Sequence, residues 1–362
     1  MIAFLDLKPG ADAADVRAAI ERVIARGWFI LGPELEAFEQ EFAAACGAPH
    51  AVGVGTGTDA LALALRACGV GPGDEVITAP VSAVFSALAI MMAGARPVFA
   101  DIDPDRLTMD PRAVEAAVTS RTRAIMPVHL YGQPADMPAL AAVAERHHLL
   151  VIEDCCQAHL ATCGGRPVGS FSTAAAYSFY PTKNLGALGD GGAVTTVDPG
   201  VAAKLKRLRN GGQTDRYHHS EFGVNSRLDE MQAAVLRARL AWLPRWTQER
   251  RALAAVYRKQ LAGAPVAVPP ECDPGHVYHL FPVLSPGRSA LQSHLKSRGI
   301  ETLIHYPVSI PRQPALQSER PDGCPVADRV CGEVVSLPLH IGMTRQAVEE
   351  VASALQAFHA VA

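Results

Sequence analysis

The chain has 362 residues, more than one hydrophobic core usually holds, so we expect a large domain over residues 1–244 and a small one over residues 245–362. The net charge of −3 and the scattered lysines and arginines exclude an extended basic surface, and no nucleic-acid partner is expected. The first residues show no signal-peptide pattern, and the longest apolar run, Val81–Ala95, is too short to span a membrane. The eight cysteines show no paired zinc spacing, so we expect reduced thiols, no metal site and a cytoplasmic protein that does not bind membranes.

Apolar runs and helical periodicity alternate along the first two thirds of the chain. Strands are predicted at Glu75–Thr78, Pro97–Ala100, Ala124–Val128, Leu149–Glu153, Ala174–Phe179 and Ala193–Thr196. Helices are predicted at Pro111–Val118, Met137–His147 and Leu228–Leu240, with a buried helix within Val81–Ala95. Because strands that alternate with helices form parallel units, we predict an α/β fold with a mostly parallel sheet and helices on both faces.

The last third of the chain shows a different order of elements. Pro244, which follows the helix at Leu228–Leu240, marks the expected domain boundary. Strands at Val277–Leu284 and Glu301–His305 are predicted to bracket a helix, and a last helix closes the chain. These two helices are predicted at Ser289–Arg298 and Thr344–His359. The small domain is therefore expected to be α+β.

The segment YSFYPTKNLGALGDGG, Tyr177–Gly192, places one lysine between a strand end and a glycine-rich turn. Lysine attacks an aldehyde only as a neutral amine, which a partly desolvated pocket favours. Lys183 is therefore the predicted nucleophile, although most lysines are solvated surface charges. The apolar neighbours expected to form its pocket are Phe179, Tyr180, Leu185 and Leu188.

Two acids end the apolar run in LLVIEDCCQ, Leu149–Gln157. A buried strand with carboxylates at its C-terminal end is expected here, which is where open parallel sheets bind ligands. A carboxylate at that position can hold a protonated ring nitrogen, and Asp154 is the better candidate. The alternative is that Glu153 and Asp154 cap a following helix. Cys155 and Cys156 are expected to be core residues beside the site, with metal binding as their alternative role.

Small residues lead into a helical run in GVGTGTDALALAL, Gly53–Leu65. Free amides of Gly57, Thr58 and Asp59 at the N-terminus of a helix favour an anion such as phosphate. Ordinary capping by Thr58 or Asp59 explains the pattern about as well. No Walker lysine follows, and the glycines do not form a dinucleotide fingerprint.

Together these segments resemble the DegT/DnrJ/EryC1/StrS family of sugar aminotransferases, which use pyridoxal 5'-phosphate (PLP) and have the fold of aspartate aminotransferase. Further segments that carry the resemblance are Phe4–Lys8, Gly27–Ala43, Pro127–Met137, Gly165–Ser172, Asn225–Arg237 and Ile304–Pro307. The resemblance implies a mostly parallel sheet of the seven-stranded type, PLP fold type I, and a smaller C-terminal domain. It also implies that PLP and its amino form PMP are the cofactors.

The resemblance assigns roles to individual residues. It implies that Lys183 forms an imine with PLP, that Asp154 pairs with the pyridine nitrogen and that Gln157 meets the ring hydroxyl. The residues implied to hold the phosphate are Gly57, Thr58, Asp59 and Ser178, joined by Asn225 of a neighbouring subunit. A homodimer with shared active sites follows. The residues expected near the substrate are Trp28, Phe29, Tyr180, Tyr278, His279, His305 and Tyr306.

Three positions depart from the family pattern. Ala83 stands where the family usually stacks an aromatic ring on the cofactor, and Phe85 need not face the same way. Cys156 stands where a smaller alanine is common on the opposite face of the ring. Pro311 replaces the usual histidine after Ile304–Pro307, which removes one expected substrate contact.

The resemblance implies transfer of an amino group from glutamate to a nucleotide-linked keto sugar, most nearly a dTDP-3-keto-6-deoxyhexose. UDP-linked 3-keto sugars, 4-keto sugars and glutamine as donor stay open. A PLP-dependent sugar dehydratase of the same family typically has histidine in place of the lysine, which Lys183 argues against. A non-catalytic sensor with this fold and an NAD-dependent sugar oxidoreductase are the rivals from other classes, and the second lacks its glycine fingerprint.

Overall fold

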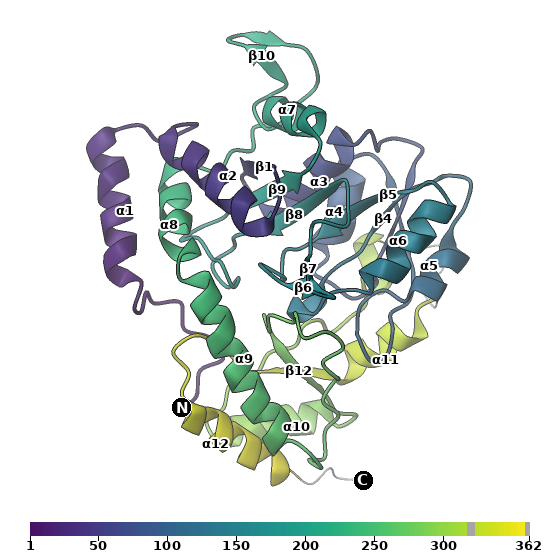
Figure 1. Ribbon diagram of the computed structural model, residues 1–362. Helices are drawn as coiled ribbons and strands as arrows, with labels where there is room; N and C mark the ends of the chain where they lie inside the picture. The colour runs from purple at the N-terminus through teal and green to yellow at the C-terminus, as the bar shows by residue number, and fades with distance from the viewer. Residues whose placement is uncertain (317–322, 359–362) are drawn as a thin grey trace.

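A computed structural model of the chain describes residues 1–316 and 323–358, and its centre is a seven-stranded sheet (Figure 1). In spatial order the strands are β1-β9-β8-β5-β4-β2-β3, and only β9 runs antiparallel to its neighbours. Their bounds are β1 His50–Val54, β2 Glu75–Thr78, β3 Arg96–Phe99, β4 Thr122–Met126, β5 Leu150–Asp154, β8 Ala174–Ser178 and β9 Gly192–Thr196. The predicted α/β class and parallel sheet are confirmed, and the six predicted strands lie within two residues of the observed ones. Of the seven strands in this sheet, only the edge strand β1 was missed.

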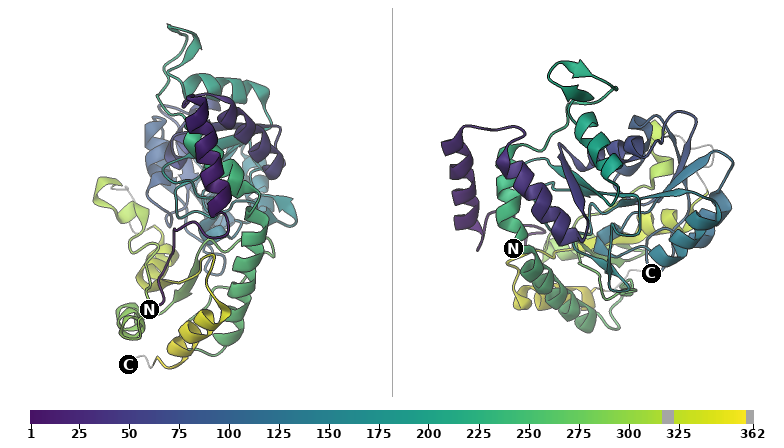
Figure 2. Two further views of the ribbon diagram at one scale, coloured as in Figure 1. Left: turned by 90° about the vertical axis from the view of Figure 1, so that its left-hand side faces the viewer. Right: turned by 45° about the horizontal axis from the view of Figure 1, so that its top comes forward.

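Helices cover both faces of this sheet (Figures 1 and 2). The helices are α1 Ala13–Arg26, α2 Pro33–Cys46, α3 Gly57–Ala67, α4 Phe85–Met92, α5 Pro111–Ala117, α6 Met137–Arg146, α7 Pro199–Leu208 and α8 Glu230–Leu240. Helices α3, α4 and α7 share a core with Ile152 and Val194, whereas α2 and α8 pack on the opposite face with Ala175 and Tyr177. Successive strand residues therefore point to opposite faces and into separate cores.

The C-terminal elements form a smaller layer below the sheet (Figure 1). They are α9 Leu243–Gln260, β12 Phe281–Leu284, α10 Arg288–Ser297, α11 Pro325–Glu333, β13 Val334–Leu337 and α12 Arg345–Gln356. β12 and β13 pair antiparallel, and α9, α10 and α12 bury them in a core of their own. Pro244 lies in the first turn of α9, where proline is well tolerated. Ile2 pairs with Ile300, so the N-terminal segment joins this layer, and the division of the chain at residue 244 stays a prediction.

Three predicted elements differ from the structure. The strand expected at Val277–Leu284 is only β12, because Tyr278 adopts a φ of 47° that breaks the extended chain. The strand expected at Glu301–His305 is replaced by an isolated bridge from Leu303 to Ser336 of β13, a strand that sequence reasoning missed. The last helix ends at Gln356, and His359 lies outside the described residues.

The helix expected to be buried within Val81–Ala95 is the short α4, which exposes one apolar side. Phe85, Met91 and Met92 are about half exposed, whereas Ala87 and Ile90 are buried. The prediction of a wholly buried helix was therefore wrong, because a uniformly apolar run carries no signal for which side faces the protein. Within the described ranges, every helix is too short or too polar to cross a membrane.

Short elements connect the larger ones. They are β6 Thr162–Cys163, β7 Arg166–Pro167, β10 Gln213–Asp215, β11 His218–His219 and the 3-10 turns η1 Leu130–Gly132, η2 Ile310–Arg312 and η3 Pro314–Leu316. The β10–β11 hairpin projects from the body of the protein in both figures. Its exposed position places the segment that follows it, which includes Asn225, on the surface.

The two acids at the end of β5 form hydrogen bonds with different parts of the chain. Glu153 is fully buried and accepts hydrogen bonds from the amides of Gly169 and Phe171 and the hydroxyl of Ser172. The Nε2 atom of His129 lies 3.0 Å from the same carboxylate, and its Nδ1 accepts the Ala135 amide, so Nε2 is the donor toward Glu153. No helix follows β5, where the chain turns toward β6, so the helix-cap alternative is wrong.

We predict that Glu153→Ala lowers the free energy of unfolding by about 3 kcal/mol or more, because it leaves several buried donors without an acceptor. Urea unfolding followed by circular dichroism measures this change. The matched control is Glu145→Ala on the exposed side of α6, which should change stability by about 0.5 kcal/mol or less. Equal stabilities of the two variants would contradict the prediction that the hydrogen bonds of Glu153 stabilise the fold.

Candidate active site

The N-terminus of α3 forms an anion-binding corner at the C-terminal edge of the sheet. Thr56 is the N-cap, and its hydroxyl accepts the amide of Asp59 at 3.0 Å, so the predicted free amide of Asp59 is already used. Within residues 1–316 and 323–358, the amides of Gly57 and Thr58 have no acceptor and remain available at the positive end of the helix. The Asp59 carboxylate accepts the hydroxyl of Ser226 at 2.7 Å.

Gly57 allows α3 to approach the end of β8 closely. A Cβ atom at this position would lie 2.6 Å from Cβ of Ser178 and 3.1 Å from Sγ of Cys156. Only glycine fits this distance without a shift of β8. The structure thus brings together Gly57, Ser178 and Cys156, which the sequence suggested from three separate segments.

Asp154 lies on the face of the sheet opposite to Glu153 and is buried. Its Oδ1 accepts the amide of Cys156 at 3.1 Å, and its Oδ2 accepts the hydroxyl of Ser86 at 2.9 Å. Ser82 extends this arrangement, since its hydroxyl lies 3.1 Å from that of Ser86. Sequence reasoning missed Ser86, because a serine at the start of an apolar helix carries no signal for its long-range partner.

Gln157 joins the sheet to the C-terminal part of the chain. Its Oε1 accepts the amide of Tyr131 at 2.7 Å, and its Nε2 donates to the hydroxyl of Tyr306 at 3.2 Å. Burial raises the pKa of Tyr306 to about 12, so the hydroxyl stays protonated. Tyr306 therefore meets Gln157 beside Asp154, although the two segments are far apart in sequence.

Lys183 lies in the turn after β8, where its surroundings favour the neutral amine. Burial lowers the pKa of Lys183, and the charges of Cys156 and Asp154 act against this effect. Of the four apolar neighbours expected to form its pocket, Phe179 and Leu185 are buried. The other two, Tyr180 and Leu188, are about half exposed, so they contribute less to desolvation than expected.

Three imidazoles surround the amine and remain neutral. Burial, followed by the charge of Lys183, lowers the pKa of His159 to about 3, of His305 to about 4 and of His279 well below its usual range. His279 and His305 were expected near the substrate, whereas His159 was not singled out. His279 contacts the residue after the lysine, because its Nδ1 lies 3.2 Å from Oδ1 of Asn184.

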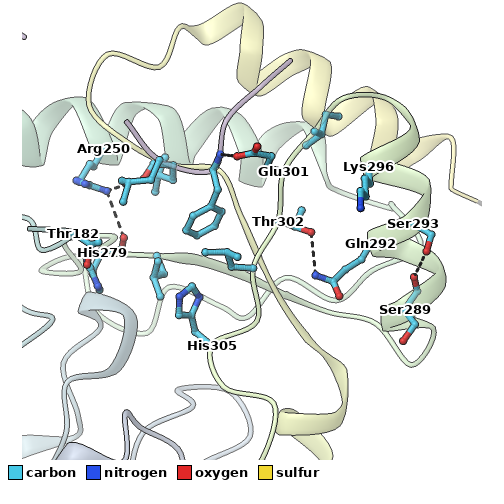
Figure 3. Close-up of a pocket in the computed structure, with 16 residues that line it drawn as sticks. Thr182, Arg250, His279, Ser289, Gln292, Ser293, Lys296, Glu301, Thr302 and His305 are labelled. Atoms are coloured by element: carbon cyan, nitrogen blue, oxygen red, sulfur yellow. Dashed lines mark hydrogen bonds between the residues drawn. The ribbon is translucent and has the colours of Figure 1, made fainter. Parts of the chain in front are cut away.

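A cavity of about 770 Å³ lies beside these residues (Figure 3). Thr182, His279 and His305 line one end, and Gln292 and Lys296 of α10 line the other. This volume is in the range of small-molecule sites. A second cavity of about 380 Å³ is lined by Lys183 and Asn184 and shares Thr182 with the first.

The structure does not bring the other expected substrate residues to these cavities. Tyr278 is buried elsewhere, where its ring stacks on His276 at 3.9 Å and its hydroxyl bonds to Arg258 and Glu271. The expected substrate residues Trp28, Phe29 and Tyr180 are about half exposed and line neither cavity, and Tyr306 lines neither as well. Asn225, which was expected at the phosphate of a neighbouring subunit, is exposed and also lines neither cavity. Their roles in a single chain stay predictions.

Ala83 has no ring to stack on a cofactor, and Phe85 is the nearest aromatic residue along the chain. Ala83 lies just before α4, and the ring of Phe85 is about half exposed at the start of that helix. Within the described ranges, no hydrogen bond or ring contact connects Phe85 with Asp154 or Lys183. Phe85 therefore does not take the place of the missing aromatic ring in an isolated chain.

The donor set fits pyridoxal phosphate. A buried carboxylate suits a protonated ring nitrogen, a buried amine of lowered pKa suits imine formation, and the free amides of Gly57 and Thr58 suit a phosphate. Gly57 supports the fit independently, since any side chain there would fill the space between α3 and β8.

We predict that Gly57→Ala lowers the free energy of unfolding by about 1–3 kcal/mol, because the added methyl group collides with Ser178. The affinity for PLP should fall as well, as the amides move. Thermal unfolding and fluorescence titration with PLP measure the two effects. Gly71→Ala is the matched control, since its Cβ would meet only one atom, at 3.9 Å, and an equal loss in both variants would contradict the role of Gly57.

Comparison with known proteins supports the same conclusion. A dTDP-3-amino-3,4,6-trideoxy-alpha-D-glucose transaminase of Streptomyces venezuelae is 52% identical over 346 residues, which are 93% of this chain and 91% of that protein. A UDP-N-acetyl-3-dehydro-alpha-D-glucosamine 3-aminotransferase of Acidithiobacillus ferrooxidans is 42% identical over 94% of this chain and 93% of its own length. The crystal structure of S. venezuelae DesV in complex with a ketimine intermediate matches 98% of this chain and 97% of that chain with a TM-score of 0.95 and 50% identity.

The similarity extends over nearly the whole chain. The pattern of the DegT/DnrJ/EryC1/StrS aminotransferase family matches residues 11–356, which include the α3 corner, both acids of β5, Lys183 and the C-terminal layer. The chain therefore belongs to the DegT/DnrJ/EryC1/StrS aminotransferase family.

Proposed function

We propose that this protein is a PLP-dependent aminotransferase that moves the amino group of glutamate to a dTDP-linked 3-keto-6-deoxyhexose. The observation that carries the proposal is the desolvated amine of Lys183 near the buried Asp154 at the C-terminal edge of the sheet. Nucleotide and keto position follow from the S. venezuelae relative, which is named for a dTDP-3-amino sugar and is 52% identical.

The residues divide the work of transamination. When bound, PLP supplies an electron sink conjugated to the substrate nitrogen. Asp154, held by Ser86 and the Cys156 amide, keeps a proton at the ring nitrogen. Gln157 is placed to meet the ring hydroxyl, and the Gly57 and Thr58 amides hold the phosphate.

Lys183 has two tasks that require the same lowered pKa. Its neutral amine would attach the cofactor; once released, it would take the α-proton of the donor and return a proton to the carbon on the other side of the donor nitrogen. The lowered pKa values of His279 and His305 make these imidazoles weak bases, so the Lys183 amine is the stronger proton acceptor of the three. The acceptor ketone then undergoes the reverse sequence.

A UDP-linked 3-keto sugar is the second candidate substrate. The A. ferrooxidans relative is named for such a substrate and is 42% identical to this chain. Its lower identity favours the dTDP-linked sugar. A sugar dehydratase is disfavoured by Lys183, and a non-catalytic sensor by the joint presence of Lys183, Asp154 and Gln157 in one buried site.

We place the protein in the cytoplasm as a homodimer. All eight cysteines are free, which suits a reducing compartment. Apolar side chains of Trp28, Phe29, Phe85 and Met92 are about half exposed, and a second copy of the chain would cover such a surface. Asn225 is exposed after the projecting hairpin, which supports its proposed reach into a neighbouring site.

The test of the proposal is a panel of dTDP- and UDP-linked 3-keto and 4-keto sugars with glutamate or glutamine as donor. We predict that, with glutamate as donor, mass spectrometry shows the conversion of a dTDP-linked 3-keto sugar into the corresponding 3-amino sugar. Lys183→Ala should remove both this product and the visible absorbance of bound PLP, with an unchanged circular dichroism spectrum. Activity that survives in Lys183→Ala would refute the proposal, and a product only from a UDP-linked sugar would select the second candidate.

The shared site has its own prediction. Lys183→Ala and Asn225→Ala homodimers should each be inactive, whereas mixing them should restore part of the activity, because half of the sites in a hybrid dimer carry neither change. Transaminase activity after subunit exchange, with exchange verified by native mass spectrometry, measures this recovery. Full activity of Asn225→Ala alone, or no recovery after exchange, would contradict the shared site.

A further inference from the structure

Arg250 is a buried cation without an acidic partner. It lies on α9 with 4% of its surface exposed, and its Nη1 donates to the carbonyl oxygens of Leu339 at 2.9 Å and Tyr278 at 3.3 Å. Its Nε is buried and has no hydrogen-bond partner in the described chain. Burial lowers the pKa of Arg250 to about 10, so the guanidinium remains charged at neutral pH.

Other buried arginines of the described residues have carboxylate partners. Arg239 pairs with Asp12 at 2.9 Å, and Arg209 pairs with Glu39. Within residues 1–316 and 323–358, no aspartate or glutamate forms an ion pair with Arg250. An uncompensated buried charge is unfavourable, so a ligand that brings a negative charge would complete this position.

The position of Arg250 connects it to the reacting lysine. Arg250 lines the larger cavity with His279 (Figure 3) and the smaller cavity with Lys183. Its Nη1 also contacts the carbonyl oxygen of His279, whose ring contacts Asn184, the residue after Lys183. The positive charges of both Lys183 and Arg250 contribute to lowering the pKa of His279, which places all three groups in one neighbourhood.

We propose that Arg250 binds a carboxylate of the amino-acid donor, an inference that rests on the proposed function. All its hydrogen bonds to the protein use Nη1, and Nε is buried, which leaves Nη2 as the donor for a carboxylate. The carboxylates of glutamate are a few bonds from the reacting amine, whereas a hexose ring separates the phosphates of a nucleotide sugar from its ketone. The exposed Lys296 at the far end of the larger cavity suits such a hydrated phosphate better than the buried Arg250 does.

The test separates the two half-reactions of the PLP-loaded enzyme. Arg250→Lys keeps the charge but not the Nη2 donor, and Arg250→Met removes both. We predict that Arg250→Lys raises the apparent Kd for L-glutamate at least tenfold, about 1.4 kcal/mol, in rapid-mixing measurements of cofactor absorbance. Arg250→Met should raise it further. The reaction of the PMP form with the keto sugar should change by about twofold or less in Arg250→Lys.

A binding measurement removes the dependence on catalysis. Glutarate, a dicarboxylate without an amine, should bind the wild-type holoenzyme in calorimetric titration and bind both Arg250 variants at least tenfold more weakly. Arg251→Met is the matched control, since Arg251 is the next residue on α9 and donates to the His276 carbonyl at 2.9 Å but lines neither cavity. It should leave glutarate and glutamate binding unchanged.

Other outcomes would overturn the assignment. Equal losses in both half-reactions together with a lower melting temperature would make Arg250 a structural residue that only holds the carbonyl groups. A loss confined to the keto-sugar half-reaction would assign the anion to the nucleotide. A wild-type enzyme that accepts glutamate but no keto sugar would count against the proposed function alone, because glutarate and glutamate binding would still decide the role of Arg250.

Discussion

The alternation of side chains at the end of β5 is the constraint on which the site depends. Glu153 and Asp154 are neighbours in sequence, and the period of two along a strand sends them to opposite faces of the sheet. Glu153 binds the loop at 169–172 and His129, which fixes the end of the strand. Asp154 is then free to face the α3 and α4 side. A shift of one residue would exchange the two positions and turn Asp154, the proposed catalytic carboxylate, toward the groups that Glu153 binds.

The carboxyl end of the sheet collects groups that no single segment supplies. α3 brings an amide corner, β8 ends at Ser178, and the loop before α11 brings Tyr306 to Gln157. The close packing of α3 against the end of β8, for example, requires that residue 57 has no Cβ atom. Because the groups come from separate loops, one loop can change without the others, and sites at this edge of related sheets can bind different substrates.

Two basic side chains of this region are desolvated, Lys183 and Arg250, and the imidazoles near them stay neutral. For Lys183 the consequence is a neutral, reactive amine. Arg250 cannot lose its proton at neutral pH, so its need for a counter-charge persists until a ligand supplies one. The two basic groups thus respond to the same environment in different ways.

The sequence by itself determined the α/β class and the order of the parallel strands along the chain, and it nominated Lys183, Asp154 and the α3 corner as site residues. These follow from local patterns, namely apolar runs, glycine-rich turns and acids at strand ends. Tertiary structure alone decided that Thr56 caps α3, that Ser86 holds Asp154, and that Arg250 lacks a counter-charge, because these contacts join residues whose partners leave no mark in the local sequence. It also decided that Tyr278 turns away from the cavity, because a left-handed backbone at that residue ends the strand that its apolar neighbours predicted.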